Sequence, residues 1–239
     1  MTHCTSMIEA FRAGGDFHSR TAMDMYPHVR KAVEAGEVLL EWDTALGAPT
    51  KPLLKDLYGS ERRRAKVLNF SIAYGKTASG LAKDWGVPLK EAKATLDAWY
   101  CSRPEVLEWQ RRTIVEAHAT GLTRTLMGRY RPLQGINDRT SRSLRNHAER
   151  AAINTPIQGG AADIVMAGMI KIHTNSLLRQ LGWRILLQIH DEIILEGPAV
   201  SADTVFPIVM HCMEHPFKRD LLVDLVVNGK VADTWYDAK

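Results

Sequence analysis

Apolar residues recur at helical spacing through most of the first 180 positions. The clearest helix is predicted to start near Ser60. Ser60 is a plausible N-cap, and the negative charge of Glu61 is favourable in the first turn. Before it, the stretch 43–51 is loop-like, with Gly47, Pro49 and Thr50 interrupting any period. Further helices are predicted over 81–85, 89–119 with a break at 102–104, 141–153, and 161–178 after an interruption at Thr155–Pro156.

The pattern changes after residue 180. Compact aliphatic runs at 184–189 and 193–196 are separated by His190, Asp191 and Glu192, which predicts a hairpin with a polar turn. A helix over 201–213 and an alternating strand over 222–227 follow. Short strands are also expected at 122–126 and 130–133, flanking Gly128. We therefore predict an α+β fold that is mostly helical, with a small antiparallel sheet near the C-terminus.

Composition and charge narrow the function. The 239 residues are 45% hydrophobic and 24% charged, typical of a globular protein, and no apolar run reaches the ~18–20 residues of a membrane span. We expect no membrane partner. The net charge is +4, and the segment 121–150 alone carries +5, from seven arginines against Asp138 and Glu149. Such clustering suits a polyanion such as nucleic acid, and a solvated helix face is an equally good interpretation of the charge alone.

Arg62, Lys66, Phe70 and Tyr74 recur every four residues. Each step of four advances about 40° around a helix, so the four side chains form one spiralling stripe of two cations followed by two rings. Cations one turn apart repel each other unless they share an anion, and a triphosphate would satisfy both. The rings could stack on a sugar or base. Core packing of the rings is the alternative.

The turn sequence His190-Asp191-Glu192 places two carboxylates side by side. Two carboxylates at close range raise one another's pKa because their negative charges repel. A bound divalent cation removes the energetic cost of that repulsion. An ordinary polar turn is the alternative. A further set, Arg150, Asn154 and Gln158, recurs at steps of four across Pro156 and could donate to base edges and sugars. Ordinary capping and turn chemistry around the proline is the alternative.

The order of these motifs is specific. The set Arg62, Lys66, Phe70, Tyr74-Gly75, then Arg150, Asn154, Gln158-Gly159, then Gln188-Ile189-His190-Asp191-Glu192, resembles the fingers and C-terminal palm of family A (polymerase I-like) DNA polymerases. The resemblance covers nearly the whole chain. The stretches 68–76 (LNFSIAYGK) and 187–198 (LQIHDEIILEGP) look most like the plant and algal organellar branch, which implies a plastid or mitochondrion.

The resemblance implies a role for each motif residue. His18, Arg62 and Lys66 would hold the triphosphate of the incoming dNTP, Phe70 would pack on its sugar, and Tyr74 would stand near the templating base. Arg150, Asn154, Gln158 and His190 would contact primer–template DNA. Asp191 would bind catalytic metal with Glu192 in support, in a site for two Mg²⁺ ions, and Lys66 would also assist catalysis.

The same resemblance implies domain boundaries. Residues 1–26 would form a helical segment after the first palm strand and 27–58 an insertion-like segment. Residues 59–135 would form the fingers and 136–239 the C-terminal palm with its hairpin. The implied reaction is attack of the primer 3′-hydroxyl on the α-phosphate of a dNTP, in DNA replication and repair.

The family places a first metal aspartate in a strand ending DYSQIELR, upstream of a segment like 7–11 of this chain. The 239-residue chain starts beyond that strand, so we expect it to be inactive or nearly so by itself. Primer extension by the purified chain, with Asp191→Ala as control, tests this expectation. Robust templated synthesis that is lost in the variant would contradict it.

The sequence alone leaves two other functions open. A non-catalytic DNA-binding remnant would keep the basic segment and bind DNA in a salt-sensitive way, without responding to dNTP or Mg²⁺. A His-Asp metal phosphohydrolase would need additional metal-binding histidines and would leave the stripe from Arg62 to Tyr74 unexplained.

Overall fold

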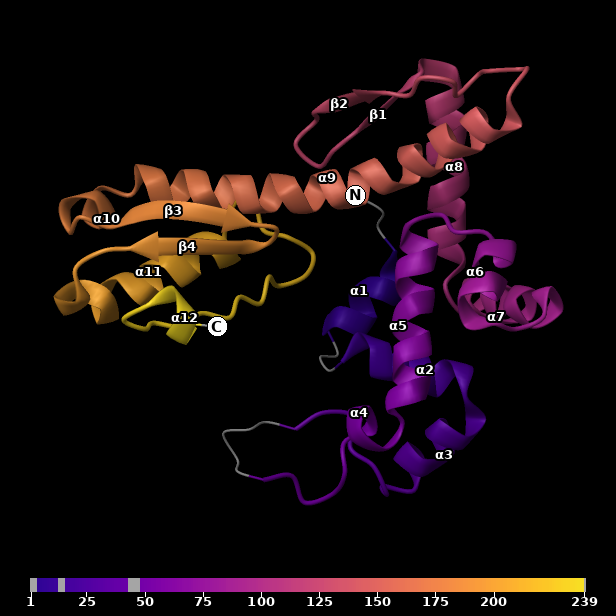
Figure 1. Cartoon of the computed structure of the whole chain (residues 1–239), viewed down its shortest axis with the longest axis horizontal. Helices are drawn as coiled ribbons and strands as arrows, with labels where there is room; N and C mark the ends of the chain where they lie inside the picture. Colours follow the sequence, from indigo (N-terminus) through magenta and orange to yellow (C-terminus); the bar gives the residue numbers. More distant parts are fainter. Residues whose placement is uncertain (1–3, 13–15, 43–47, 239) are drawn as a thin grey trace. The chain divides into compact units, whose positions relative to one another are not determined.

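The computed structural model describes residues 4–12, 16–42 and 48–238. It confirms the α+β prediction, because the described chain is mostly helical with two small two-stranded sheets (Figure 1). The chain divides into two compact units. The first comprises 1–123 and 130–155, and the second comprises 124–129 and 156–239. In the described ranges, no helix has both the length and the apolar character needed to cross a membrane.

The first unit is helical and is organised around α5. Its helices are α1 (Thr5–Arg12), α2 (Phe17–Met25), α3 (Pro27–Glu34), α4 (Leu54–Leu57), α5 (Gly59–Ala73), α6 (Ala78–Trp85), α7 (Leu89–Ser102) and α8 (Pro104–Thr120). Helix α5 packs against α2, α4 and α6, and α7 packs against α6 and α8. The predicted break at 102–104 is confirmed. Of the predicted loop 43–51, residues 43–47 lie outside the described residues, and the rest contains no helix or strand.

The start of α5 differs from the prediction. The helix begins at Gly59 with Tyr58 as the N-cap residue, and no side chain caps it. Ser60 is already inside the first turn, where its hydroxyl donates to Glu61 Oε2 at 2.6 Å instead of accepting from a backbone N–H. The prediction that Ser60 caps this helix was therefore wrong, because the helix begins at Gly59, two residues before the start that a Ser60 cap implies.

The predicted interruption at Thr155–Pro156 was also wrong. Helix α9 runs without a break from Arg142 to Thr174, with Pro156 inside it. A proline cannot donate to the carbonyl four residues earlier, here that of Ala152. Thr123 Oγ1 donates to that carbonyl at 3.1 Å, so the group that the proline leaves unpaired is satisfied from another element. Residues of α9 up to Thr155 belong to the first unit and those from Pro156 to the second.

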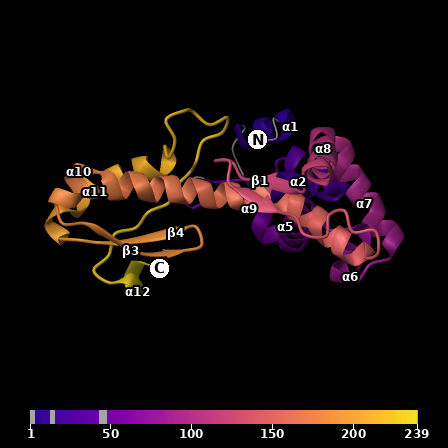
Figure 2. The ribbon, with the colours of Figure 1, turned by 90° about the horizontal axis from the view of Figure 1, so that it is seen from above.

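The second unit pairs a β-hairpin with helices. Its elements are the C-terminal part of α9, α10 (Ser176–Gln180), β3 (Arg184–Ile189), β4 (Glu192–Glu196), a 3₁₀ turn η2 (Ala199–Ser201), α11 (Ala202–Glu214) and α12 (Trp235–Ala238). Strands β3 and β4 are antiparallel, as predicted, with Ile189 opposite Glu192. The hairpin runs beside α9 in both views (Figures 1 and 2), and a core that includes Ile172, Leu178, Val205 and Cys212 joins it to the helices.

The remaining strand predictions had mixed outcomes. Strands β1 (Leu122–Arg124) and β2 (Tyr130–Pro132) form a second small sheet, shorter than expected. The predicted strand at 222–227 is absent, since these residues carry no regular secondary structure. Their burial does alternate, with 223, 225 and 227 less exposed than their neighbours. Alternating burial shows that one face of the segment packs against the protein. A strand also needs backbone hydrogen bonds to a neighbouring strand.

Candidate functional site

The stripe predicted along α5 is present: Arg62 is half-buried, and Lys66, Phe70 and Tyr74 are exposed. Lys66 Nζ lies 5.9 Å from the centroid of the Phe70 ring, and the Phe70 and Tyr74 rings stack with centroids 6.3 Å apart and planes 9° from parallel. Phe70 is 46% exposed and Tyr74 is 37% exposed, so core packing does not explain these two rings. A cation beside two stacked, accessible rings offers a charged group and a flat apolar surface to the same ligand.

The opposite face of α5 explains why the stripe is held outward. Ala65, Leu68 and Ile72 are 0–1% exposed and lie in the core of the first unit. They fall three, four and seven positions apart, which is the spacing of one helix face. Burying this face leaves Lys66 and Phe70 on the accessible side.

Arg62 has an acidic partner that the motif pattern did not reveal. It forms an ion pair with Asp16, which is also the N-cap of α2 and accepts from the His18 backbone N–H at 3.2 Å and from Ser19 Oγ at 2.6 Å. Burial raises the pKa of the Asp16 carboxyl, but the hydrogen bonds from Arg62 and Ser19 outweigh it and lower this pKa to about 2. Asp16 is therefore charged at neutral pH and holds Arg62 in place. An aspartate two residues before His18 is an N-cap signal that could have been read from the sequence.

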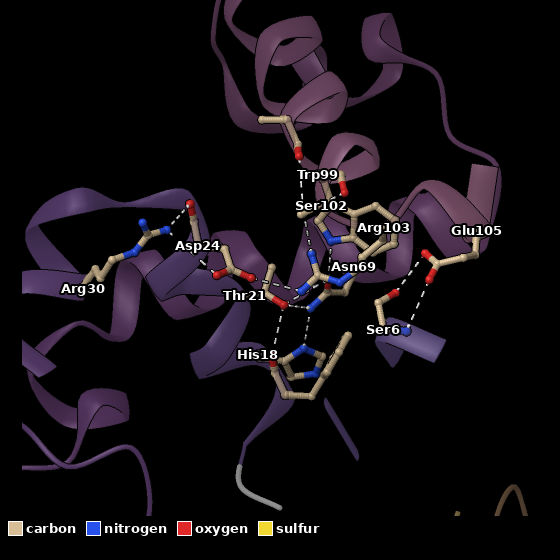
Figure 3. A network of polar contacts seen from close by, with 12 residues as sticks. Ser6, His18, Thr21, Asp24, Arg30, Asn69, Trp99, Ser102, Arg103 and Glu105 are labelled. Carbon is tan, nitrogen blue, oxygen red and sulfur yellow. Dashed lines mark hydrogen bonds and ion pairs between the residues drawn. The ribbon is translucent and has the colours of Figure 1, made fainter. Parts of the chain in front are cut away.

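His18 lies beside the stripe. Its ring centroid is 5.8 Å from that of Phe70, with the planes tilted by 47°. Burial lowers the His18 pKa from its usual value, and the positive charges of Arg62 and Lys66 lower it further against the opposing effect of Asp16. The lowered pKa favours the neutral imidazole form of His18. Figure 3 shows the polar network behind it, in which Asn69 joins His18 to Thr21 and Trp99.

An open hollow of about 370 Å³ adjoins the two stacked rings. Its lining is Val67, Phe70, Ser71, Tyr74, Lys76, Asp84 and Arg150. Gly75 brings the end of α5 close to α9: its φ is 63°, and a Cβ there would lie 3.3 Å from Ile153 Cδ1 and 3.5 Å from Arg150 Cγ. Only glycine combines that conformation with so close an approach. The structure therefore places Arg150 on the same hollow as Phe70 and Tyr74.

The predicted DNA-contacting residues on α9 are divided between the units. Arg150 and Asn154 belong to the first unit and Gln158, which is exposed, to the second. Asn154 Oδ1 is buried and has no hydrogen-bond partner within the described residues. A buried acceptor left without a partner is costly, so this atom is a candidate for a contact made only when a ligand is bound.

The paired carboxylates lie in the second unit, at the tip of the β3–β4 hairpin. His190 adopts a left-handed backbone conformation with φ 56°, Asp191 completes the turn, and Glu192 is the first residue of β4. All three are exposed, and Gln188 donates to the His190 carbonyl. Among the described residues, no group of three or more His, Cys, Asp or Glu side chains could enclose a metal. Two carboxylates still fit Mg²⁺, which proteins often bind through one or two carboxylates plus substrate phosphates and water.

A second acidic residue that the sequence analysis missed is Asp163 on α9. It is 2% exposed; Asp163 Oδ1 accepts from Arg129 Nε at 2.8 Å, and Asp163 Oδ2 accepts from the Met127 backbone N–H at 2.8 Å. Arg129 also donates to the Gly159 carbonyl at 3.3 Å. Asp163 therefore holds residues 124–129 against the helix that carries Gln158. No spacing in the sequence links 129 to 163, so no local signal could have found this contact.

The structure gathers the predicted residues in two groups. His18, Arg62, Lys66, Phe70, Tyr74 and Arg150 lie on one side of the first unit's helices, and His190, Asp191 and Glu192 form the hairpin tip of the second. The first group offers cations, a neutral imidazole and stacked rings. The second offers hard oxygen ligands.

Solved structures and sequence relatives identify the class of protein. The chain superposes with a TM-score of 0.76 and 31% identity on the POL domain of Pol1 from M. smegmatis, solved in complex with DNA primer-template and dNTP, over 94% of this chain and 35% of that one. Residues 46–237 match the model of DNA polymerase family A. The chain belongs to DNA polymerase family A.

Curated relatives agree with this assignment. The chain is 58% identical over its whole length to DNA polymerase I A, chloroplastic/mitochondrial, of Arabidopsis thaliana, and covers 23% of that protein. It is 53% identical over its whole length to DNA polymerase I A, chloroplastic, of Oryza sativa subsp. japonica, again covering 23%. Identity to DNA polymerase I of Geobacillus stearothermophilus is 36% over 98% of this chain and 24% of that protein. The chain thus spans about a quarter of the length of these relatives.

Proposed function

We propose that this chain forms the fingers and part of the palm of an organellar DNA polymerase, which transfers nucleotides from dNTPs to a primer 3′-hydroxyl on a DNA template. The observation that carries the proposal is the exposed stripe on α5, where Lys66, Phe70 and Tyr74 follow one another beside a neutral His18. The plastid or mitochondrial location rests on the names of the plant relatives.

The residues of the first unit would bind the incoming nucleotide. Arg62, Lys66 and His18 would hold the triphosphate, Phe70 would pack on the sugar, and Tyr74 would stand near the templating base. Arg62 suits this role because Asp16 holds its side chain while 29% of that side chain stays accessible. Lys66 is exposed, and the described residues offer it no carboxylate, so a phosphate would find its charge available.

The DNA and metal contacts would involve α9 and the hairpin. Arg150, Asn154, Gln158 and His190 would contact primer–template DNA, and the unpartnered Asn154 Oδ1 supports such a contact. Asp191 would hold Mg²⁺ with Glu192 in support. When bound, such metal ions stabilise negative charge on the attacking and leaving oxygens of a phosphoryl transfer. The fingers (59–135) and C-terminal palm (136–239) remain our domain assignment.

Binding of matched dNTP tests the proposal. Labelled primer–template with a dideoxy-terminated primer is titrated with the 239-residue chain in the presence of Mg²⁺. We expect the dNTP complementary to the template base to tighten DNA binding and mismatched dNTPs to have little effect. Lys66→Ala is expected to weaken nucleotide binding by roughly 10- to 100-fold, because a hydrogen bond to a charged group contributes about 1.5–3 kcal/mol.

The matched control is Lys90→Ala, which removes an exposed lysine from α7, away from the stripe. It should leave nucleotide binding unchanged. DNA binding that is salt-sensitive but indifferent to every dNTP and to Mg²⁺ would refute the proposal for this chain and favour the non-catalytic remnant. An equal loss in both lysine variants would show that the effect is one of general charge rather than of the stripe.

A further inference from the structure

We propose that Asn69 is a positioning residue: held by Trp99 and Thr21, it keeps His18 as a neutral imidazole protonated on Nε2, and this N–H is the group that His18 offers to the triphosphate. The inference deepens the proposed function and rests on it for the identity of the ligand. The assignment of the His18 proton to Nε2 does not depend on the proposed function, because it follows from hydrogen bonds within this chain.

Trp99 fixes which way the Asn69 amide faces. The indole Nε1 lies 3.0 Å from Asn69 Oδ1, and indole nitrogen can only donate, so the oxygen of the amide must face it. Trp99 is 6% exposed, and its ring is further held by the Arg103 guanidinium 4.8 Å away. With Oδ1 committed to Trp99, the amide nitrogen of Asn69 must point toward Thr21 and His18 (Figure 3).

Thr21 supports the same orientation. Its hydroxyl donates to the Phe17 carbonyl at 3.0 Å and is therefore free to accept from Asn69 Nδ2, also at 3.0 Å. Thr21 is fully buried, so this acceptor has a fixed position. One of the two N–H groups of Asn69 is thereby used, and the other faces His18 Nδ1 at 3.1 Å.

An amide N–H that faces Nδ1 decides the tautomer of the ring. Nδ1 must accept, so the proton of the neutral imidazole resides on Nε2 at the other edge of the ring. A protonated ring would set two N–H groups against each other at Nδ1. Burial also disfavours the charged ring, as do Arg62 and Lys66, while Asp16 has the opposite effect.

The tautomer matters because a phosphate oxygen only accepts hydrogen bonds. With the proton on Nε2, the outer edge of His18 donates to such an oxygen. With the proton on Nδ1, the same edge would present a lone pair and repel it. Asn69 therefore selects between an attractive and a repulsive contact without touching the ligand.

We call the hydrogen bonds from Trp99 through Asn69 to His18 the relay. Ring-nitrogen NMR of the 239-residue chain tests it. The His18 signals are assigned by comparison with His18→Gln, and the nitrogen shifts report which nitrogen carries the proton. We expect the Nε2–H tautomer in the native chain. Trp99→Phe keeps an aromatic ring but removes the indole N–H that holds Asn69 Oδ1. The Asn69 amide can then turn over, so the Nδ1–H tautomer of His18 should become populated. Asn69→Asp should raise the pKa of His18, because a carboxylate accepts from a protonated Nδ1.

The chain offers a close control in Trp85→Phe. Trp85 packs in the same core cluster as Trp99, and its Nε1 is buried with no partner among the described residues, so this variant loses the same volume and no hydrogen bond. It should keep the Nε2–H tautomer. We expect Trp99→Phe and His18→Gln to weaken dGTP binding by roughly 10- to 100-fold, the loss of one hydrogen bond to a charged group, and Trp85→Phe to leave it unchanged.

The outcomes separate the relay from the proposed function. If Lys66→Ala abolishes nucleotide binding while His18 is protonated on Nδ1, or does not respond to Trp99→Phe, the relay is refuted and the proposed function stands. If the tautomer changes as expected but dGTP binding is the same in Trp99→Phe and His18→Gln, the assignment of His18 to the triphosphate is refuted. If no variant or native chain binds dGTP at all, the proposed function fails for this chain.

Discussion

Replacing Leu68 with alanine is expected to lower the free energy of unfolding of the first unit by about 3–4 kcal/mol. Leu68 has no exposed surface and lies with Ile72, Leu81 and Trp99 in one core cluster. Truncation removes three buried carbon atoms and leaves a cavity that helices on several sides cannot close. Because the same helix carries Lys66 and Phe70 on its outer face, the loss should also loosen the stripe.

Urea unfolding followed by tryptophan fluorescence measures this effect. The control is Leu89→Ala, which makes the same change at a 56% exposed position at the start of α7 and should cost less than about 1 kcal/mol. Equal losses in the two variants would show that the buried face of α5 does not anchor the unit.

Replacing Asp163 with asparagine is expected to destabilise the second unit by about 2 kcal/mol and to release residues 124–129. The buried carboxylate accepts from Arg129 and from the Met127 N–H, and an amide nitrogen in place of Oδ2 would face that N–H with another donor. The cost stays below the ~3–5 kcal/mol of a broken buried ion pair, because the Arg129 side chain is 63% exposed and water can solvate it. Amide hydrogen exchange at Met127 reports the effect directly, with faster exchange expected in the variant.

The effect should depend on pH with a defined sign. Burial raises the pKa of Asp163, but hydrogen bonds from Thr125, Met127 and Arg129 outweigh it, so the folded-state pKa lies below the ordinary value. A lowered folded-state pKa stabilises the fold above the unfolded-state pKa of about 3.9, and this stabilisation is lost as the pH falls through the folded-state value. The difference between native chain and variant should therefore shrink on acidification. Asp203→Asn, at an exposed position in the first turn of α11, should change stability by at most about 0.5 kcal/mol at any pH. A difference that grows at low pH would contradict the assignment.

Patterns that repeat along one element were predicted well. The four-residue spacing of Lys66 and Phe70 placed both on one face of α5, and the polar residues between two aliphatic runs placed Asp191 at a hairpin turn. In each case neighbours in sequence are also neighbours in space, because one helix or one turn connects them. The roles of these residues toward nucleotide, DNA and metal remain proposals.

Predictions failed where a distant partner decided the outcome. Pro156 should end a helix, and it does not, because Thr123 satisfies the carbonyl that the proline cannot reach. The alternating run at 222–227 should be a strand, and it is not, because alternation does not provide a second strand. The Asp163 contact with Arg129 and the Asn69 contact with His18 join residues far apart in sequence, with no local signal.

The sequence by itself therefore determined the helical character of the chain, the faces of its helices and the candidates for its chemically active side chains. Those properties follow from the 3.6-residue and two-residue periods and from the side chains themselves. Only the tertiary structure decided that Asp16 holds Arg62, that Asn69 faces His18 with its N–H, and that Arg150 shares a hollow with Phe70. Hydrogen-bond partners and ring protonation depend on distances of about 3 Å between separate elements, and packing alone sets those distances.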